Sequence, residues 1–257
     1  MADTPTPTPS CDADRALLAV LGMHVVGRAY PGTGGVGGRV VQRHHGHLVA
    51  GAGQLRHDLT EQGLRHTVAM AWSPGARQLY ATQNNRDQLD ALWKDKFTAE
   101  DNNSRPAEEL QLLKQGANFG WPYCFYDIPS KKRLLNPEYG GDGRTVGRCA
   151  SLTAPLYGLP AHRGPNDLLF YTGAQFPARY RGGAFIALHS RANPGVAFLP
   201  FAGGRPAGPH EDFARLAAGV DPTTLRPNGL AQGRDGSLYL AEDGTGRLWR
   251  IFYTGPR

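Results

Sequence analysis

The chain has 257 residues, of which 40% are hydrophobic and 19% are charged, and its formal net charge is +6. This composition excludes a disordered acidic segment and a coiled coil. Glycine (34) and proline (20) together make 54 residues, which is more than long helices tolerate and favours short strands joined by turns. The basic residues are spread along the chain apart from one run, Lys131-Lys132-Arg133, so nucleic acid is not expected as a partner.

No stretch reaches the roughly 18 consecutive apolar residues of a membrane-spanning helix. The start of the chain also lacks the basic region that opens a signal peptide. The sequence therefore predicts no membrane span and shows no visible export signal.

Residues 1–63 differ in character from the rest of the chain. They contain no Phe or Trp, their one aromatic residue besides histidine is Tyr30, and they hold five of the nine histidines. A segment so poor in aromatic residues builds only a weak core. We expect an atypical, Gly/His/Pro-rich segment that is poorly structured or degenerate, followed by a folded region over residues 64–257.

Short apolar segments ending in polar residues recur after residue 63, separated by Pro-Gly or Asp-Gly turns. They occupy residues 64–72, 78–82, 165–171, 182–188, 225–231, 237–241 and 246–252. Repeated antiparallel pairs of this kind are typical of a β-propeller. Helix is expected only in the connections around 88–115 and 210–219.

Three cysteines cannot form a disulfide framework, and their spacing matches no zinc motif. Cys124 and Cys149 bracket a turn-rich segment. Spacing alone leaves two possibilities open, a bridge or two buried free thiols. A bridge would require Cα atoms closer than about 7 Å and would indicate an oxidising compartment.

Candidate binding residues fall where a propeller gathers its loops. The loops that leave the innermost strands meet at one end of the central channel. Those positions carry Arg65, His162, Arg226 and the polar run 83–87. Arginines beside amides and carbonyls suit an anionic, oxygen-rich ligand held with a hard cation, although solvated loop residues would give the same pattern.

One motif resembles a known family. Residues 116–124, GANFGWPYC, are similar to the GxNYGWP signature of the glucose/sorbosone dehydrogenase family, and matching segments flank it in order over 64–253. They include LRHTVAMAW (64–72), ATQNNRDQL (81–89) and RPNGLAQGRDGSLYLAEDGTGRLWRI (226–251). The match is nearest to the sorbosone dehydrogenase branch.

The resemblance implies an all-β, six-bladed β-propeller that binds pyrroloquinoline quinone (PQQ) and calcium. Such proteins oxidise a sugar or sugar aldehyde by hydride transfer to PQQ, pass the electrons to an external acceptor, and are periplasmic or secreted. Because family members are longer, it also implies an incomplete propeller of about four blades with a truncated or replaced N-terminal part.

The resemblance assigns cofactor contacts residue by residue. Arg65 would bind a PQQ carboxylate or the sugar, and His66 stands where the family has an asparagine, which puts that amide contact in doubt. His162 would lie against the quinone. Arg191, in a shortened form of the family run HGSWNR, and Arg226 would supply further cationic contacts.

The resemblance also implies a calcium site. The backbone carbonyls of Asn84 and Asn85 match the loop that holds calcium beside PQQ, and a carbonyl ligand does not depend on the side chain. Glu108 or Glu109 matches the acidic residue that follows this loop.

The family's general base does not match any residue of this chain. That histidine should lie well upstream of Arg65 among aromatic residues, and His24 and His57 lack such a context. The catalytic residue is therefore unknown. The alternative to a PQQ-dependent dehydrogenase is a non-catalytic propeller fragment, or a degenerate family member that lacks the base.

Overall fold

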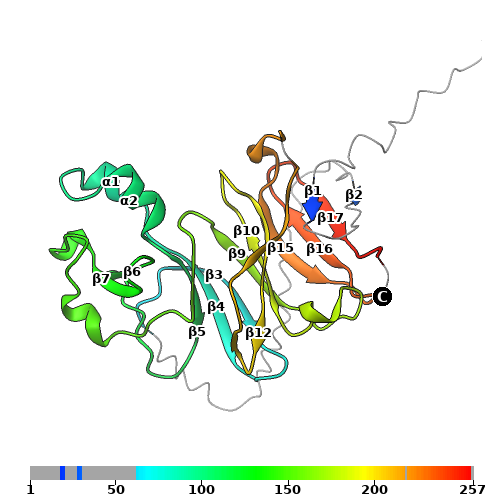
Figure 1. Ribbon diagram of the computed structural model, residues 1–257, viewed down its shortest axis with the longest axis horizontal. Coiled ribbons are helices and arrows are strands. Elements are labelled where there is room, and N and C mark those ends of the chain that lie inside the picture. Colours follow the sequence, from blue (N-terminus) through cyan, green and yellow to red (C-terminus); the bar gives the residue numbers. More distant parts are fainter. Residues whose placement is uncertain (1–17, 21–27, 31–61, 218, 256–257) are drawn as a thin grey trace, which may run out of the picture.

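Three antiparallel sheets and two small hairpins make up the described part of the chain (Figure 1). The computed structural model describes residues 18–20, 28–30, 62–217 and 219–255. No helix among these residues is long and apolar enough to cross a membrane.

The first sheet contains four strands in chain order, β3 (His66–Trp72), β4 (Leu79–Asn84), β5 (Glu108–Leu112) and β8 (Tyr157–Leu159). Its first two strands coincide with the predicted segments 64–72 and 78–82. The turn between them contains the Ser-Pro-Gly sequence, in which proline presets one backbone angle, and Arg77 takes the left-handed conformation with a φ of 49°.

The second sheet has five strands. Its order is β9 (Pro165–Phe170), β10 (Ala184–Leu188), β11 (Gly195–Leu199), β14 (Glu211–Leu216) and, at the outer edge, β1 (Leu18–Val20). Strand β14 lies where the sequence predicted helix, so that prediction is wrong for 210–219. Phe213 and Ala214 are both buried and β14 pairs with β11, so tertiary pairing overrides the local helical preference.

The third sheet follows the same plan. Its order is β15 (Pro227–Gln232), β16 (Leu238–Glu242), β17 (Leu248–Ile251) and β2 (Arg28–Tyr30). Strands β1 and β2, which belong to the predicted atypical segment, thus pair with sheets, and most of the remainder of 1–63 lies outside the described residues.

The inner strands of the three sheets lie side by side, because β9 contacts both β3 and β15. Sheets stacked in chain order around their innermost strands are the blades of a β-propeller. The fold is therefore all-β and an incomplete propeller, as predicted. Three blades lie among the described residues, where the sequence suggested about four.

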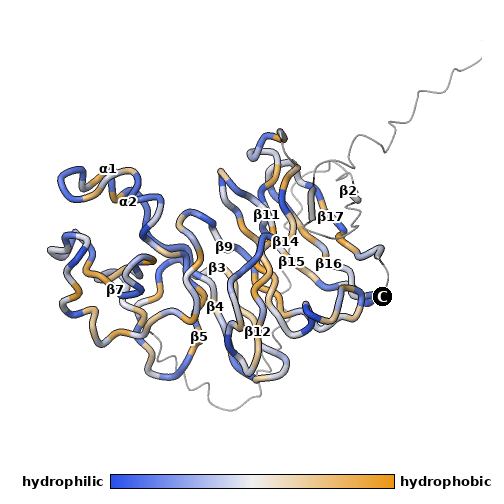
Figure 2. Tube along the Cα trace, in the orientation of Figure 1, coloured by the Kyte–Doolittle hydropathy of each residue, from blue (hydrophilic) through white to orange (hydrophobic). Residues whose placement is uncertain are grey.

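Two apolar layers hold the blades together. The layer between the first and second sheets includes Tyr80, Leu110 and Ile186, and the layer between the second and third includes Phe185 and Trp249. All five side chains are at most 2% exposed. Figure 2 shows the resulting alternation of hydrophobic and hydrophilic segments along the chain. Burial of this kind is the main stabilising contribution to the fold.

The two long connections of the first blade, residues 85–107 and 113–156, form a lobe beside it (Figure 1, left). Helices α1 (Leu89–Leu92) and α2 (Ala99–Ser104) lie between β4 and β5, as the sequence predicted for this connection. Strands β6 (Cys124–Asp127) and β7 (Lys132–Leu135) form a hairpin between β5 and β8.

Short 3-10 helices and one further hairpin complete the elements. The 3-10 helices are η2 (Pro137–Tyr139), η3 (Gly147–Ser151), η4 (Ala178–Tyr180) and η5 (Pro222–Thr224), and the hairpin pairs β12 (Phe201–Ala202) with β13 (Arg205–Pro206).

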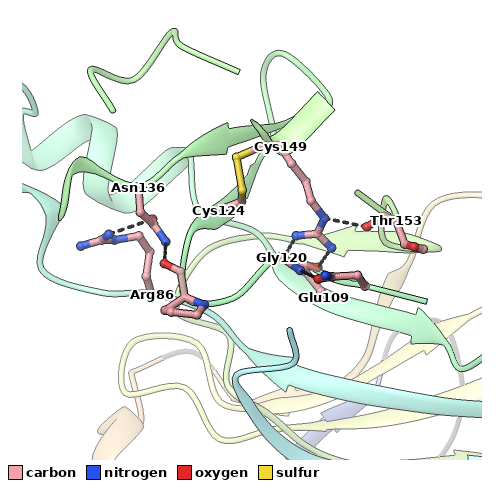
Figure 3. Close-up of a disulfide and its surroundings, with 10 residues drawn as sticks. Arg86, Glu109, Gly120, Cys124, Asn136, Cys149 and Thr153 are labelled. Atoms are coloured by element: carbon pink, nitrogen blue, oxygen red, sulfur yellow. Dashed lines mark hydrogen bonds and ion pairs between the residues drawn. A yellow bond between two sulfur atoms is a disulfide. The ribbon is translucent and has the colours of Figure 1, made fainter. Parts of the chain in front are cut away.

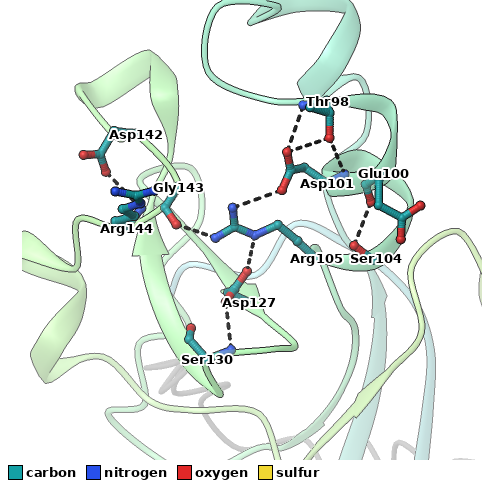
Figure 4. A network of polar contacts seen from close by, with 10 residues as sticks. All are labelled: Thr98, Glu100, Asp101, Ser104, Arg105, Asp127, Ser130, Asp142, Gly143 and Arg144. Atoms are coloured by element: carbon teal, nitrogen blue, oxygen red, sulfur yellow. Dashed lines mark hydrogen bonds and ion pairs between the residues drawn. The ribbon is translucent and has the colours of Figure 1, made fainter.

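Arg105 ties helix α2 to strand β6 and to the loop at Gly143, within the lobe (Figure 4). Its Nε donates to Asp127 at 2.7 Å, its Nη1 to Asp101 at 3.4 Å, and its Nη2 to the carbonyl of Gly143. Thr98 and Asp101 form a reciprocal capping box at the start of α2, which satisfies two otherwise unpaired amides. These contacts fix α2, none of whose own residues is buried.

The disulfide left open by the sequence is formed. Cys124 and Cys149 are bonded, with Cα atoms 6.0 Å apart, and link β6 to η3 (Figure 3). Both residues are 2% exposed. The bridge therefore closes the lobe, and the alternative of two free thiols is excluded.

Candidate functional site

One end of the three sheets collects the loops that precede the inner strands. The antiparallel registers pair the first residue of each inner strand with the last residue of its neighbour: His66 with Asn84, Pro165 with Leu188, and Pro227 with Glu242. Residues just outside these pairs therefore lie at the same end of adjacent sheets. We name this end the mouth; it comprises residues 65–66, 83–87, 162–166, 189, 226–228 and 243.

Arg65 contacts the loop that follows β4. Its Nη1 donates to the carbonyl oxygen of Asn84 at 2.9 Å and to that of Asn85 at 2.5 Å. Its guanidinium carbon lies 5.2 Å from the ring centroid of Trp121, within the range of a cation–π contact. The two carbonyls that the resemblance assigns to calcium thus accept hydrogen bonds from a protein cation.

Two buried carboxylates support this loop from below. Glu108 accepts from the backbone N–H of Asn85 at 2.6 Å, and Glu109 accepts from the Asn85 side chain at 2.7 Å. Burial raises the pKa of Glu108 from 4.5 to about 7. Glu109 is instead ion-paired with Arg133 (Figure 3), so the two adjacent glutamates have different roles.

His162 is held in an unusual conformation at the mouth. Its φ of 59° lies in the left-handed region, which is uncommon for a residue other than glycine. Its Nδ1 lies 2.8 Å from Asp87 and its Nε2 lies 3.0 Å from the carbonyl of Asn102. The hydrogen bond with Asp87 raises the pKa of His162 and lowers that of Asp87. These partners orient the imidazole and favour its charged form.

Arg226 lies in a second histidine–aspartate group. Its Nη2 donates to His189 Nδ1 at 2.8 Å, and His189 Nε2 lies 3.0 Å from Asp243. Because Arg226 can only donate, the proton of a neutral His189 is assigned to Nε2. The Arg226 Nε is buried and has no hydrogen-bond partner among the described residues. An unpaired buried donor of this kind costs free energy unless a ligand or water satisfies it.

A row of amides connects the three blades at the mouth. Asn84 donates to Asn166 at 3.4 Å, and Asn166 donates to Asn228 at 3.1 Å. The Oδ1 of Asn84 is buried and unpaired in the described part of the chain. The repeated Pro-Asn dipeptide at 165–166 and 227–228 is the sequence signal that could have identified this row.

The predicted site residues divide into two groups. Arg65, Asn84, Asn85, His162 and Arg226 lie in the contacts described above.

The other two predicted residues are exposed. His66 is exposed at the start of β3, and Arg191 is exposed in the loop after β10, so their roles stay predictions. The sequence placed Asp87 in the polar run 83–87 without a role, and it assigned no role to His189 or Asp243, which become recognisable only when their partners are known. No group of three or more His, Cys, Asp or Glu side chains suited to a metal ion occurs among the described residues.

Several known proteins are similar to this chain. A Borreliella burgdorferi protein described only as uncharacterized is 23% identical over 207 residues, which is 77% of this chain and 49% of that protein. A solved glucose dehydrogenase has TM-score 0.53 and 23% identity over 81% of this chain and 49% of its own. The calcium structure of Trichoderma reesei Carbohydrate-Active Enzymes Family AA12 has TM-score 0.57 and 21% identity, covering 76% and 53%.

The chain therefore spans about half the length of the relatives it matches. At these identities the solved structures share its fold, which supports the assignment as a β-propeller of the sugar dehydrogenase type. A family model described as TrAA12-like matches residues 57–254, which is most of the chain. This chain belongs to the TrAA12-like family.

Proposed function

We propose that the mouth binds PQQ and that the protein oxidises a sugar or sugar aldehyde, as the sorbosone dehydrogenase branch does. The observation that carries the proposal is the placement of two arginines, Arg65 and Arg226, at one end of three adjoining blades. Membership of the TrAA12-like family and the fold shared with a glucose dehydrogenase support it.

The donors of the mouth fit a flat polyanion. PQQ carries three carboxylates and an ortho-quinone, so its site must supply several cations and hydrogen-bond donors. The buried, unpaired Nε of Arg226 is such a donor, and His162 adds a favoured positive charge. When bound, PQQ would supply the hydride acceptor, while Arg226 and His162 would hold it in place.

The carbonyls of Asn84 and Asn85 do not fit a calcium ion in the same way, because Arg65 Nη1 already donates to both. We therefore assign no step to calcium. PQQ binding by the arginines and histidine does not require one.

A non-catalytic PQQ-binding module is the second candidate function. Oxidation of a sugar hydroxyl needs a base with a free lone pair. Both ring nitrogens of His162 and both of His189 already have hydrogen-bond partners. Among the histidines of the mouth, His66 is exposed and is the imidazole left to test.

A periplasmic or secreted location belongs to the same proposal. The bridge between Cys124 and Cys149 would persist in an oxidising compartment. In such a location an external acceptor would take up the electrons.

The test is to titrate the purified chain with PQQ, follow the PQQ absorption spectrum, and then add an aldose or L-sorbosone with a redox dye. Binding with dye reduction supports the dehydrogenase, and binding without reduction supports the non-catalytic module. A spectrum unchanged by the chain contradicts both.

A further inference from the structure

The backbone carbonyls of Asn84 and Asn85, which Arg65 contacts, form a preformed cation-binding position. We name it the carbonyl seat. Successive carbonyls of a regular strand point in opposite directions, yet the oxygens of Asn84 and Asn85 both lie within 2.9 Å of a single nitrogen. Two convergent carbonyl oxygens are ligands typical of a hard cation. The end of β4 therefore departs from strand geometry in a way that concentrates negative partial charge at one point.

The seat is held rigidly by buried contacts. Asn85 is 4% exposed, and both its backbone N–H and its side chain donate to buried glutamates. The next residue, Arg86, donates from its backbone to the Asn85 side chain at 2.9 Å and from Nη1 to Asn136 at 2.8 Å. These hydrogen bonds fix the loop after β4 and so keep the carbonyls of Asn84 and Asn85 pointing toward the same position.

The guanidinium of Arg65 matches this seat. Nη1 carries two N–H groups, which equals the number of carbonyls it contacts. Within the described part of the chain, the other three N–H groups, on Nε and Nη2, have no acceptor and can donate to an anion. The ring of Trp121 lies against the guanidinium, and Asp87 interacts with it electrostatically. Both contacts stabilise the positive charge of Arg65.

A metal ion and this guanidinium cannot share the seat. Arginine has no lone pair to offer a metal, and two positive charges a few ångströms apart repel strongly in a partly buried site. We propose that Arg65 is the resident cation of the Asn84–Asn85 carbonyl seat, so that this chain binds its anionic ligand there without calcium. The ligand's identity rests on the proposed function, whereas the occupancy of the seat does not.

Terbium tests the seat on the chain without any cofactor. Terbium(III) binds hard oxygen ligands as calcium does, and its luminescence is sensitised by a nearby tryptophan such as Trp121. The unmodified chain should give no sensitised signal that calcium can displace. Arg65→Ala and the neutral, longer Arg65→Gln should each bind terbium at least about tenfold more tightly and lose the signal when calcium is added.

Three controls isolate the seat. Arg226→Ala removes an equal charge from the mouth and leaves the carbonyls occupied, so it should give no signal. Arg65→Lys retains a cation and should also give none. Adding Trp121→Phe to Arg65→Ala should abolish the sensitised emission, and thermal melts of each variant report whether it is folded.

Two results would overturn the proposal: terbium binding by the unmodified chain as tight as that of Arg65→Ala, or folded neutral variants that gain no binding. A separate measurement addresses PQQ, whose affinity for the unmodified chain should change less than about twofold when a chelator replaces calcium. If PQQ does not bind at all, the proposed function fails while the terbium result still decides the seat.

Discussion

Glu109 and Arg133 form a completely buried ion pair between the first blade and its disulfide-bonded lobe. Arg133 Nη2 lies 2.7 Å from Glu109 Oε2 and Nη1 lies 3.2 Å from Oε1, and the two side chains are 0% and 2% exposed. Arg133 Nε also donates to the carbonyl of Thr153 at 2.6 Å. This pair lies directly beneath Asn85 and so connects the lobe to the loop that Arg65 contacts.

Removing one member of this pair should be strongly destabilising. Arg133→Ala leaves the Glu109 carboxylate buried without its counter-ion, which costs about 3–5 kcal/mol of unfolding free energy. Urea denaturation measures it.

The matched control is Arg179→Ala, because Arg179 is 55% exposed and pairs with Glu211, which is 35% exposed, so water screens this pair. That variant should lose less than about 1 kcal/mol. Equal losses for the two variants would contradict a special role for the buried pair.

The disulfide should stabilise the lobe measurably. Its cysteines are 25 residues apart, and loop-closure entropy for that length corresponds to about 3.5 kcal/mol. Denaturation with and without a reductant should differ by this amount in the unmodified chain. Cys124→Ser should show the reduced stability and no response to the reductant; an unmodified chain indifferent to reduction would argue against the bond.

Glu108 should make stability depend on pH. Its pKa is about 7 in the folded chain against an ordinary value of 4.5, so the folded state binds the proton more tightly than the unfolded state. The contribution of Glu108 to the free energy of unfolding is fully present below about pH 4.5. It is lost as pH rises through about 7, and the loss amounts to up to about 3 kcal/mol.

Glu108→Gln should remove this dependence. The raised pKa of His162 also favours stability at low pH that is lost as pH rises through its folded-state pKa. Because the Glu108 charge also raises the pKa of His162, the difference between the unmodified chain and the variant reports Glu108 together with its effect on His162. Parallel stability curves for the two proteins between pH 4.5 and 7 would show that the glutamate does not titrate there.

Arg226 should contribute directly to cofactor affinity. A hydrogen bond to a charged group contributes about 1.5–3 kcal/mol, so Arg226→Ala should weaken PQQ binding by about 10- to 150-fold. Arg181→Ala is the matched control, since Arg181 is exposed in the loop between β9 and β10, at the opposite end of the blades. Absorbance titration compares them, and equal affinities for both variants would place the site elsewhere.

The strands of the blades were predictable from the sequence because their signal is local. Alternating apolar residues and Pro-Gly or Asp-Gly turns specified β3 with β4 and β15 with β16 at nearly the observed bounds. The same local reasoning failed for Glu211–Leu216, where pairing with β11 and burial of Phe213 decide the conformation. Local preference is weak compared with the burial of a large aromatic side chain.

The site depended on tertiary structure for a different reason. The sequence and its resemblance to a family predicted Arg65, His162 and Arg226 as residues of one site. Their partners, Asn85, Asp87 and His189, lie 20, 75 and 37 residues away from them, and no periodicity relates such positions. The burial that raises the pKa of Glu108 and the hydrogen bonds from Arg65 to the carbonyls of Asn84 and Asn85 form only once the blades pack and exclude water.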